Sequence, residues 1–230
     1  MVLREIDALV FDVLGTLVDE PAGIRAAIRE FAPVLPGEAV EELTRGWQQY
    51  VGEQQRRVVE RERPYVPSEV LDREAAERIA RASGNSDSAA VDVLAGAGSR
   101  LTPWPDVARG LERLAGRFPV IALSNASRTA LLRLNAGAGL RWHQALSAQD
   151  VRGYKPDPAV YELAVEVAGV PAERLLMVAA HAWDLRAARK AGLRTAYVAR
   201  PVGDPPAPGD RFDHHAKDLA DLAAQLGPAL

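Results

Sequence analysis

Cysteine is absent from this chain of 230 residues. Disulfide bonds, thiolate metal sites and a cysteine nucleophile are therefore excluded. Long apolar runs are also missing, so no stretch of the sequence predicts a membrane-spanning helix. The first ten residues, MVLREIDALV, carry Glu5 and Asp7 where a secretory signal would have an apolar segment. We therefore expect a soluble, cytoplasmic protein with no membrane partner.

An excess of charge of either sign is lacking as well. The chain has 28 basic and 31 acidic residues, a net charge of −3, and both signs are mixed along its length. Because proteins that bind nucleic acids gather basic residues on one face, we expect no nucleic-acid partner. Hydrophobic residues make up 48% of the sequence, which is enough for a large core, and the length suits one domain or a core with a smaller insertion.

Short, almost wholly apolar runs are spaced along the chain and alternate with helical patterns in its C-terminal half. Such runs are typical of strands in a parallel sheet that helices cover on both faces. Strands are expected at 8–13, 120–123, 145–147 (the weakest), 175–179 and 195–198, and helices at 107–114, 128–134, 158–167, 183–191 and 217–226. This alternation predicts an α/β fold with right-handed crossovers.

The segment between residues 20 and 100 interrupts the alternation. It has no convincing strand, and its apolar side chains repeat at helical spacing from Val40 to Val51 and from Val70 to Ile79. We interpret this segment as a helical block inserted between the first strand and the rest of the sheet.

Polar side chains gather where the predicted strands end. In an open α/β sheet, ligands bind beyond the carboxyl ends of the strands. The residues concerned are Asp12 and Thr16 after the first strand, Ser124 and Asn125 after the second, Lys155 upstream of strand 175–179, and His181 and Asp184 after it. Each residue alone is weak evidence, but their order along one sheet predicts an active site at that edge.

Four motifs occur in order along the chain: FDVLGT (11–16), LSN (123–125), YKPDP (154–158) and AHAWD (180–184). Together they make the chain resemble the haloacid dehalogenase superfamily over nearly its whole length. The resemblance implies a Rossmann-like parallel-sheet core, residues 1–18 and 100–230, with an inserted α-helical cap domain, residues 19–99. It also matches Asp12 to the catalytic nucleophile and Lys155 to the lysine that steadies its charge.

Two positions in these motifs distinguish phosphatases of this superfamily from dehalogenases. Phosphatases begin D-x-D, and the second acid protonates the leaving oxygen; here that position is Leu14, which cannot transfer a proton. Phosphatases also hold Mg²⁺ with two acids, but the two positions here are Ala180 and Asp184. Because a hard cation needs several oxygen ligands, the pattern favours a reaction without a metal or other cofactor.

The sequence resembles the type II (S)-2-haloacid dehalogenases, which implies a hydrolase acting on the carbon–halide bond of small 2-haloalkanoic acids. In that branch the aspartate displaces the halide to give an ester, and water hydrolyses the ester, so one hard displacement becomes two easier steps. Asp12 would be the nucleophile and Thr16 would orient it. An aspartate ionises at a pKa of about 3.9, and Lys155 would keep Asp12 charged despite burial. Asp184 with His181 would position the hydrolytic water.

The resemblance also implies roles for other residues near these motifs. Ser124 and the backbone beside it would hold the substrate carboxylate, and Asn125 would face the departing halide. Tyr161 matches a further active-site tyrosine, and Trp183 would wall the pocket. Asp184 is also expected to cap the helix that follows it.

One expected residue is missing. Dehalogenases of this type carry an arginine in a Trp-Arg pair of the first long cap helix, where it binds the substrate and draws off the halide. The pair here is Trp47-Gln48, and a glutamine amide stabilises a departing anion less than a fixed cation does. Arg45, three residues before Gln48 on the predicted helix, would substitute for it, as would Arg56 or Arg57.

Alternatives remain open at the level of sequence. The leaving group need not be halide, for example if the enzyme opens a strained ring next to a carboxylate. A phosphatase with an unusual site, or a non-catalytic binding protein on the same scaffold, would keep the same fold. The resemblance is also compatible with a homodimer. The neighbouring His214 and His215, without a third ligand, are expected in a loop and not at a metal.

Overall fold

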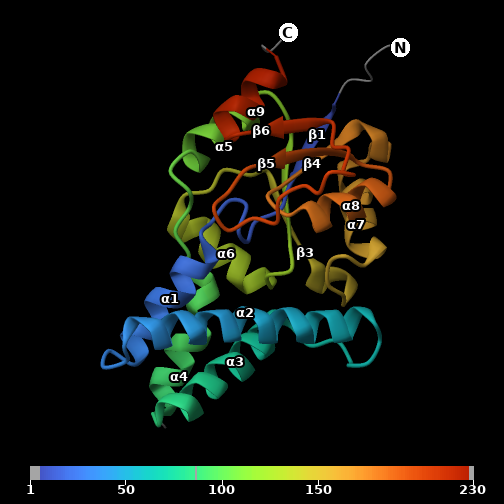
Figure 1. The fold of residues 1–230 in the computed structure, drawn as a ribbon. Coiled ribbons are helices and arrows are strands. Elements are labelled where there is room, and N and C mark those ends of the chain that lie inside the picture. The colour runs from blue at the N-terminus through green and yellow to red at the C-terminus, as the bar shows by residue number, and fades with distance from the viewer. Residues whose placement is uncertain (1–5, 86, 228–230) are drawn as a thin grey trace.

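The computed structural model describes residues 6–85 and 87–227. Its centre is a six-stranded sheet in the order β3-β2-β1-β4-β5-β6, and every neighbouring pair of strands is parallel (Figure 1). The strands are β1 (Ala8–Phe11), β2 (Val120–Ser124), β3 (Gln144–Ser147), β4 (Leu175–Ala179), β5 (Arg194–Val198) and β6 (His214–Ala216). β1 is an inner strand and is buried along its whole length, which explains its uninterrupted apolar sequence.

Helices cover both faces of the sheet, so the predicted α/β class is confirmed. The covering helices are α7 (Pro158–Ala168) and α8 (Ala182–Lys190) on one face, and α5 (Val107–Ala115), α6 (Arg128–Ala138) and α9 (Leu219–Gln225) on the other. Because the side chains of a strand alternate, successive residues of β1 enter opposite cores: Leu9 and Phe11 pack in one, Val10 in the other. Full burial of each such side chain contributes about 1.5–3 kcal/mol, so β1 is firmly fixed.

Four further helices lie together below the sheet in Figure 1. They are α1 (Glu20–Phe31), α2 (Gly37–Val59), α3 (Ser68–Ser83) and α4 (Ser88–Ala95); short 3-10 helices lie at Ala97–Ser99, Ala148–Val151 and Ala172–Arg174. The four helices share a core of their own, which includes Ile28, Trp47 and Ile79. The Asp19 carboxylate caps α1 by accepting a hydrogen bond from the Ala22 N–H at 3.0 Å. The division into a core and a cap at residues 18–19 and 99–100 stays a prediction.

The prediction of a loop at His214 and His215 is wrong, because both residues lie in the edge strand β6. This strand pairs with β5, and the His215 ring packs against the rings of Tyr197 and Phe212. A three-residue strand at the edge of a sheet needs few apolar residues. The two histidines therefore give no strand pattern in the sequence. No helix in the described part of the chain is both long and apolar enough to cross a membrane.

Candidate active site

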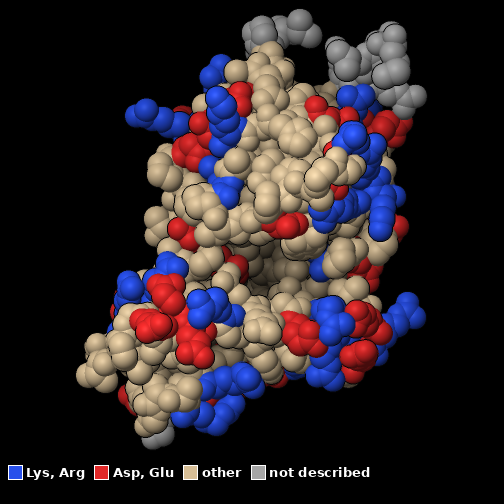
Figure 2. All heavy atoms as spheres, viewed as in Figure 1, with Lys and Arg blue, Asp and Glu red and all other residues tan. Residues whose placement is uncertain are grey.

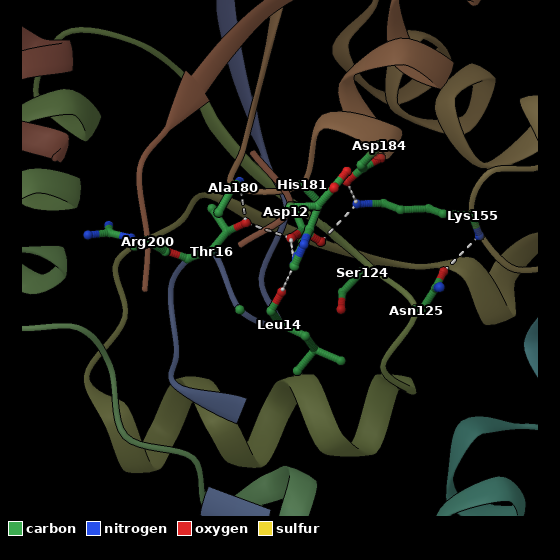
Figure 3. A network of polar contacts seen from close by, with 12 residues as sticks. Asp12, Leu14, Thr16, Ser124, Asn125, Lys155, Ala180, His181, Asp184 and Arg200 are labelled. Atoms are coloured by element: carbon green, nitrogen blue, oxygen red, sulfur yellow. Dashed lines mark hydrogen bonds and ion pairs between the residues drawn. The ribbon is translucent and has the colours of Figure 1, made fainter. Parts of the chain in front are cut away.

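The Asp12 side chain lies just beyond the carboxyl end of β1, at the centre of a polar network (Figure 3). Its Oδ2 accepts a hydrogen bond from the Thr16 hydroxyl at 2.6 Å, and its Oδ1 accepts one from Lys155 Nζ at 3.0 Å. The backbone N–H of Asp12 donates to the Val178 carbonyl in β4, which fixes the residue to the sheet. Asp12 is only 6% exposed, and its carboxylate accepts hydrogen bonds from two donors.

Thr16 can orient Asp12 because its own hydroxyl is fixed in turn. The Ala180 N–H, at the end of β4, donates to Thr16 Oγ1 at 2.9 Å. A hydroxyl has a single proton to donate, and with Ala180 on its acceptor side that proton is directed at Asp12. The sequence motif predicted this orientation, and the structure supplies the Ala180 contact that it did not foresee.

Arg200, which was not predicted from the sequence, holds the same turn from behind. Its Nε donates to the Thr16 carbonyl at 2.9 Å, and its two terminal nitrogens bind the Asp106 carboxylate at 2.8 and 3.0 Å. A paired guanidinium and carboxylate is a rigid link. It ties the loop after β5 to the start of α5 and to the turn that carries Thr16. No local sequence signal marks Arg200, since its partners are distant along the chain.

Lys155 is the charged centre of the network. Its Nζ lies 3.0 Å from Asp12 Oδ1 and 2.7 Å from Asp184 Oδ2, and its side chain is 1% exposed. Burial opposes the charge of the ammonium group, but the Asp12 and Asp184 carboxylates outweigh this effect and raise the pKa of Lys155. Lys155 therefore remains positively charged at neutral pH and keeps the neighbouring carboxylate oxygens in place.

Asp184 lies behind Lys155 and does not line the cavity described below. Its Oδ1 accepts a hydrogen bond from the Tyr161 hydroxyl at 2.6 Å and its Oδ2 accepts one from Lys155. Burial raises the pKa of Asp184, against the effect of Lys155. The prediction that Asp184 caps its helix is wrong: α8 begins at Ala182 with His181 as the N-cap, and Asp184 lies inside the first turn. That placement turns its side chain toward the lysine.

A cavity of ≈ 220 Å³ opens above Asp12, between the strand ends and helices α1 and α2. Figure 2 shows the surface hollowed at this place. Its lining residues are Asp12, Leu14, Glu20, Trp47, Gln48, Val51, Gly52, Gln55, Ser124, Asn125, Lys155, His181 and Trp183. Most of the predicted site residues therefore meet around one space. Tyr161 and Arg45 are not among the lining residues.

The Asn125 side chain connects the loop after β2 to helix α2 at the cavity wall. Its Oδ1 accepts a hydrogen bond from the Lys155 N–H at 2.8 Å, and its Nδ2 donates to Gln55 Oε1 at 3.0 Å. Ser124 is fully buried, and its Oγ accepts a hydrogen bond from the Ala126 N–H at 3.1 Å. Both side chains thus shape the loop after β2. The contact between Asn125 and Gln55 was not predicted.

Arg45 does not take the place of the missing arginine. It lies on the exposed face of α2, and Arg56 forms ion pairs at the surface with Glu53 and Glu60. The buried face of the helix is occupied by Trp47 instead, so a residue two positions earlier points elsewhere. Among the described residues that line the cavity, Lys155 and His181 are those that can carry positive charge.

His181 reaches the cavity from the loop between β4 and α8. Its Nε2 lies 3.1 Å from the Leu14 carbonyl oxygen and 4.0 Å from Asp12 Oδ2, and its ring stacks on Trp183 at 5.9 Å between centroids. Gly15 makes room for the ring: it has a φ of 78°, and a Cβ there would lie 2.6 Å from His181 Nε2. The glycine of the first motif is therefore required both by the turn and by the histidine.

Comparison with known proteins agrees with this geometry. The family model for haloacid dehalogenase-like hydrolases matches residues 6–192. The chain is 30% identical over 230 residues to an (S)-2-haloacid dehalogenase of Pseudomonas fluorescens, covering 97% of this chain and 98% of that one.

Solved structures show the same likeness. The L-2-haloacid dehalogenase PA0810 superposes with a TM-score of 0.89 at 35% identity, over 96% of this chain and all of that one. A Xanthobacter autotrophicus L-2-haloacid dehalogenase with chloropropionic acid covalently bound gives 0.83 at 28% identity, over 96% of this chain and 98% of that one. The chain therefore belongs to the haloacid dehalogenase-like hydrolase family.

Proposed function

We propose that this protein is a hydrolytic dehalogenase of small 2-haloalkanoic acids that works without a metal. One observation carries the proposal: the Asp12 carboxylate faces the cavity and is held by Lys155 and Thr16. Two residues later, where a phosphatase would need an acid, the chain has Leu14. Halide leaves as a stable anion and needs no proton, so a nucleophile without a partner acid suffices.

In the first step, an Asp12 carboxylate oxygen attacks C2 of the substrate. A carbon–oxygen bond forms as the carbon–halogen bond breaks, and the halide departs with the bonding electron pair. Lys155 and Thr16 hold the Asp12 carboxylate in its orientation, as their distances of 3.0 and 2.6 Å support. The loop at Ser124 is proposed to receive the substrate carboxylate. Asn125 and Gln48 are proposed to lie on the side from which halide leaves.

In the second step, water attacks the carbonyl carbon of the Asp12 ester. The acyl–oxygen bond breaks, the 2-hydroxy acid leaves and one proton passes to solvent. Lys155 would stabilise the negative oxygen of the tetrahedral intermediate. We assign the water to the side of His181, whose Nε2 lies 4.0 Å from Asp12 Oδ2. Asp184 and Tyr161 would act indirectly, by positioning Lys155.

Chloride release from L-2-chloropropionate tests the reaction, and Asp12→Asn is expected to abolish it. The ester route is tested by a single turnover with excess enzyme in ¹⁸O-labelled water, followed by mass spectrometry of the Asp12 peptide. Because water attacks the aspartyl carbon, the label is expected in Asp12 and not in the 2-hydroxy acid. Label in the product alone would contradict the covalent route, and Mg²⁺-dependent hydrolysis of p-nitrophenyl phosphate without halide release would make the protein a phosphatase.

Three further predictions belong to this proposal. We propose that residues 19–99 act as a cap over a core formed by residues 1–18 and 100–230, supported by the separate core of α1 to α4. We also propose that the protein is cytoplasmic. Light scattering of the purified protein would decide between a monomer and the homodimer that the resemblance allows.

A further inference from the structure

Glu20 lines the active-site cavity but has no part in the reaction proposed above. It is the first residue of α1, directly after the capping Asp19. Its side chain borders both the cavity over Asp12 and a smaller cavity of ≈ 40 Å³. The two cavities share the lining residues Leu14, Glu20, Trp47, Val51, Gln55 and Asn125, so the smaller one is an inner recess of the active site.

The recess contains a second carboxyl group, that of Asp72 in α3. The rest of its lining is mainly apolar and includes Ile24, Val51 and Ala130. No lysine, arginine or histidine is among the described residues that line it. Two acidic groups therefore face a small, largely apolar space without a basic partner. Both side chains are partly buried, and their side-chain hydrogen bonds go to the uncharged groups of Gln48 and Trp47, so the recess holds acidic groups and no cation of its own.

Burial shifts the pKa of both groups in the same direction. Burial raises the pKa of Glu20, and nearby His181 only partly offsets the effect. Burial likewise raises the pKa of Asp72 to about 8, and the proximity of Glu20 adds to the rise. An entering cation would reverse the cause, because an opposite charge within a few ångströms favours the ionised carboxylate.

Two neighbouring residues support a positive occupant. Gln48 gives this wall of the cavity a neutral amide, hydrogen-bonded to Glu20, so the wall carries an acid and no cation. The indole of Trp47, which is 4% exposed, borders both cavities. Tryptophan is the aromatic side chain that attracts cations best.

We propose that Glu20, with Asp72 behind it, makes this enzyme selective for 2-haloacids whose side chain ends in a protonated amino group. The substrate carboxylate stays at the Ser124 loop while the ammonium group enters the recess. The volume of ≈ 40 Å³ admits a group about the size of one or two waters, which suits an ammonium group and not a long chain. This inference rests on the proposed dehalogenase function.

Matched substrate pairs test the selectivity. The pairs are 2-chloro-3-aminopropionate with 2-chlorobutanoate, and 2-chloro-5-aminopentanoate with 2-chlorohexanoate. Within a pair the chain length is equal, and an ammonium group replaces a methyl group. At least one amino compound is expected to show a kcat/KM roughly 10- to 100-fold above that of its partner, the range for one hydrogen bond to a charged group. Equal or lower values for both amino compounds would overturn the inference.

Variants show whether Glu20 is responsible. Glu20→Gln keeps the shape of the side chain and is expected to remove the preference, mainly through a higher KM for the amino compound. Glu30→Gln is the matched control, because Glu30 is an exposed residue of the same helix and the net charge changes equally. A preference that survives Glu20→Gln would show that another group reads the substrate.

Binding without turnover separates this inference from the proposed function. Calorimetry on the wild-type protein would compare the halogen-free pair 3-aminopropionate and butanoate, and the pair 5-aminopentanoate and hexanoate. Tighter, Glu20-dependent binding of an amino acid would stand even if no haloacid were hydrolysed. Halide release with no such binding preference would support the function and refute the selectivity.

Discussion

At the scale of single residues, each group around Asp12 is fixed by another group farther from the cavity. Thr16 is fixed by the Ala180 N–H, and Lys155 is fixed by Asp184, which Tyr161 holds in turn. The proposed nucleophile is therefore preorganised before a substrate arrives, and little rearrangement would be needed at the moment of reaction. Substitutions in this second layer are expected to change the reaction rate although they touch no substrate.

Thr16 provides the clearest test. Thr16→Val keeps the shape of the side chain but removes the hydroxyl, so Asp12 loses a donor and the Ala180 N–H loses its acceptor. A hydrogen bond to a charged group contributes about 1.5–3 kcal/mol, so kcat for halide release is expected to fall roughly 10- to 100-fold. Thr16→Ser retains the hydroxyl and should recover most of the rate. Equal loss in both variants would show that packing, not the hydrogen bond, is what matters.

Asp72 links stability to pH. Its pKa is raised to about 8, chiefly by burial, so the folded protein retains a proton that the unfolded chain gives up near its ordinary pKa of 3.8. Stability attributable to this group is therefore full in acid, falls as the pH rises from about 4 to about 8, and levels off above that.

Asp72→Asn should remove this slope, since an amide does not ionise. The variant is expected to melt above the wild type at pH 8.5, by about 2–4 °C for each kcal/mol gained, and to match it more closely near pH 5. Thermal unfolding at the two pH values measures this. Glu77→Gln, an exposed acid on the same helix, is the control. The same pH slope in Asp72→Asn and the wild type would contradict the assignment.

At the scale of elements, the loops after β1, β2 and β4 form the site together because these strands are neighbours in a parallel sheet. β1 is hydrogen-bonded to both β2 and β4, so its loop lies between the other two. The loop after β1 must turn sharply and leave room for the His181 ring, and both requirements fall on Gly15.

Gly15→Ala should destabilise this turn for two reasons. The residue has a φ of 78°, which a side chain disfavours, and the new Cβ would lie 2.6 Å from His181 Nε2. We expect a loss of about 1–3 kcal/mol in the free energy of unfolding, measured by urea denaturation. The double variant Gly15→Ala, His181→Ala should recover the part due to the clash. Strict additivity of the two substitutions would mean that the ring and the new methyl group do not meet.

At the scale of the whole molecule, the cavity lies between the loops at the strand ends and the helices α1 and α2, and residues of both parts line it. Asn125 in the loop after β2 and Gln55 in α2 join across it by a hydrogen bond of 3.0 Å. The same amide of Asn125 accepts a hydrogen bond from the backbone N–H of Lys155, so the position of α2 is coupled to that lysine. Substrate affinity is therefore expected to depend on how α1 to α4 sit on the sheet.

Gln55→Ala tests this coupling. A partly buried hydrogen bond contributes about 1 kcal/mol, so KM for the best haloacid is expected to rise about fivefold, with a smaller change in kcat. Gln49→Ala, at an exposed position on the same helix, should leave both constants unchanged. A change confined to kcat would show that Gln55 affects the lysine directly and not the closure of the cavity.

The parts that could be predicted from the sequence are those with strong local signals. Buried strands such as β4 need apolar residues throughout, and the motifs place Asp12, Thr16 and Ser124 after strand ends and Lys155 just before a helix. The N-cap of α8 and the strand at His214 were predicted wrongly, because a cap and a short edge strand depend on contacts made elsewhere in the fold.

By itself, the sequence determined the α/β fold and the family, since apolar periodicity and motif order are properties of the chain alone. Only the tertiary structure decided which side chains share the cavity. Arg45 faces solvent, Asp184 and Tyr161 lie behind Lys155, and Glu20 enters the site from a helix that carries no motif. The physical reason is that the facing of a side chain depends on how helices pack against the sheet, and that packing brings together residues far apart in the sequence.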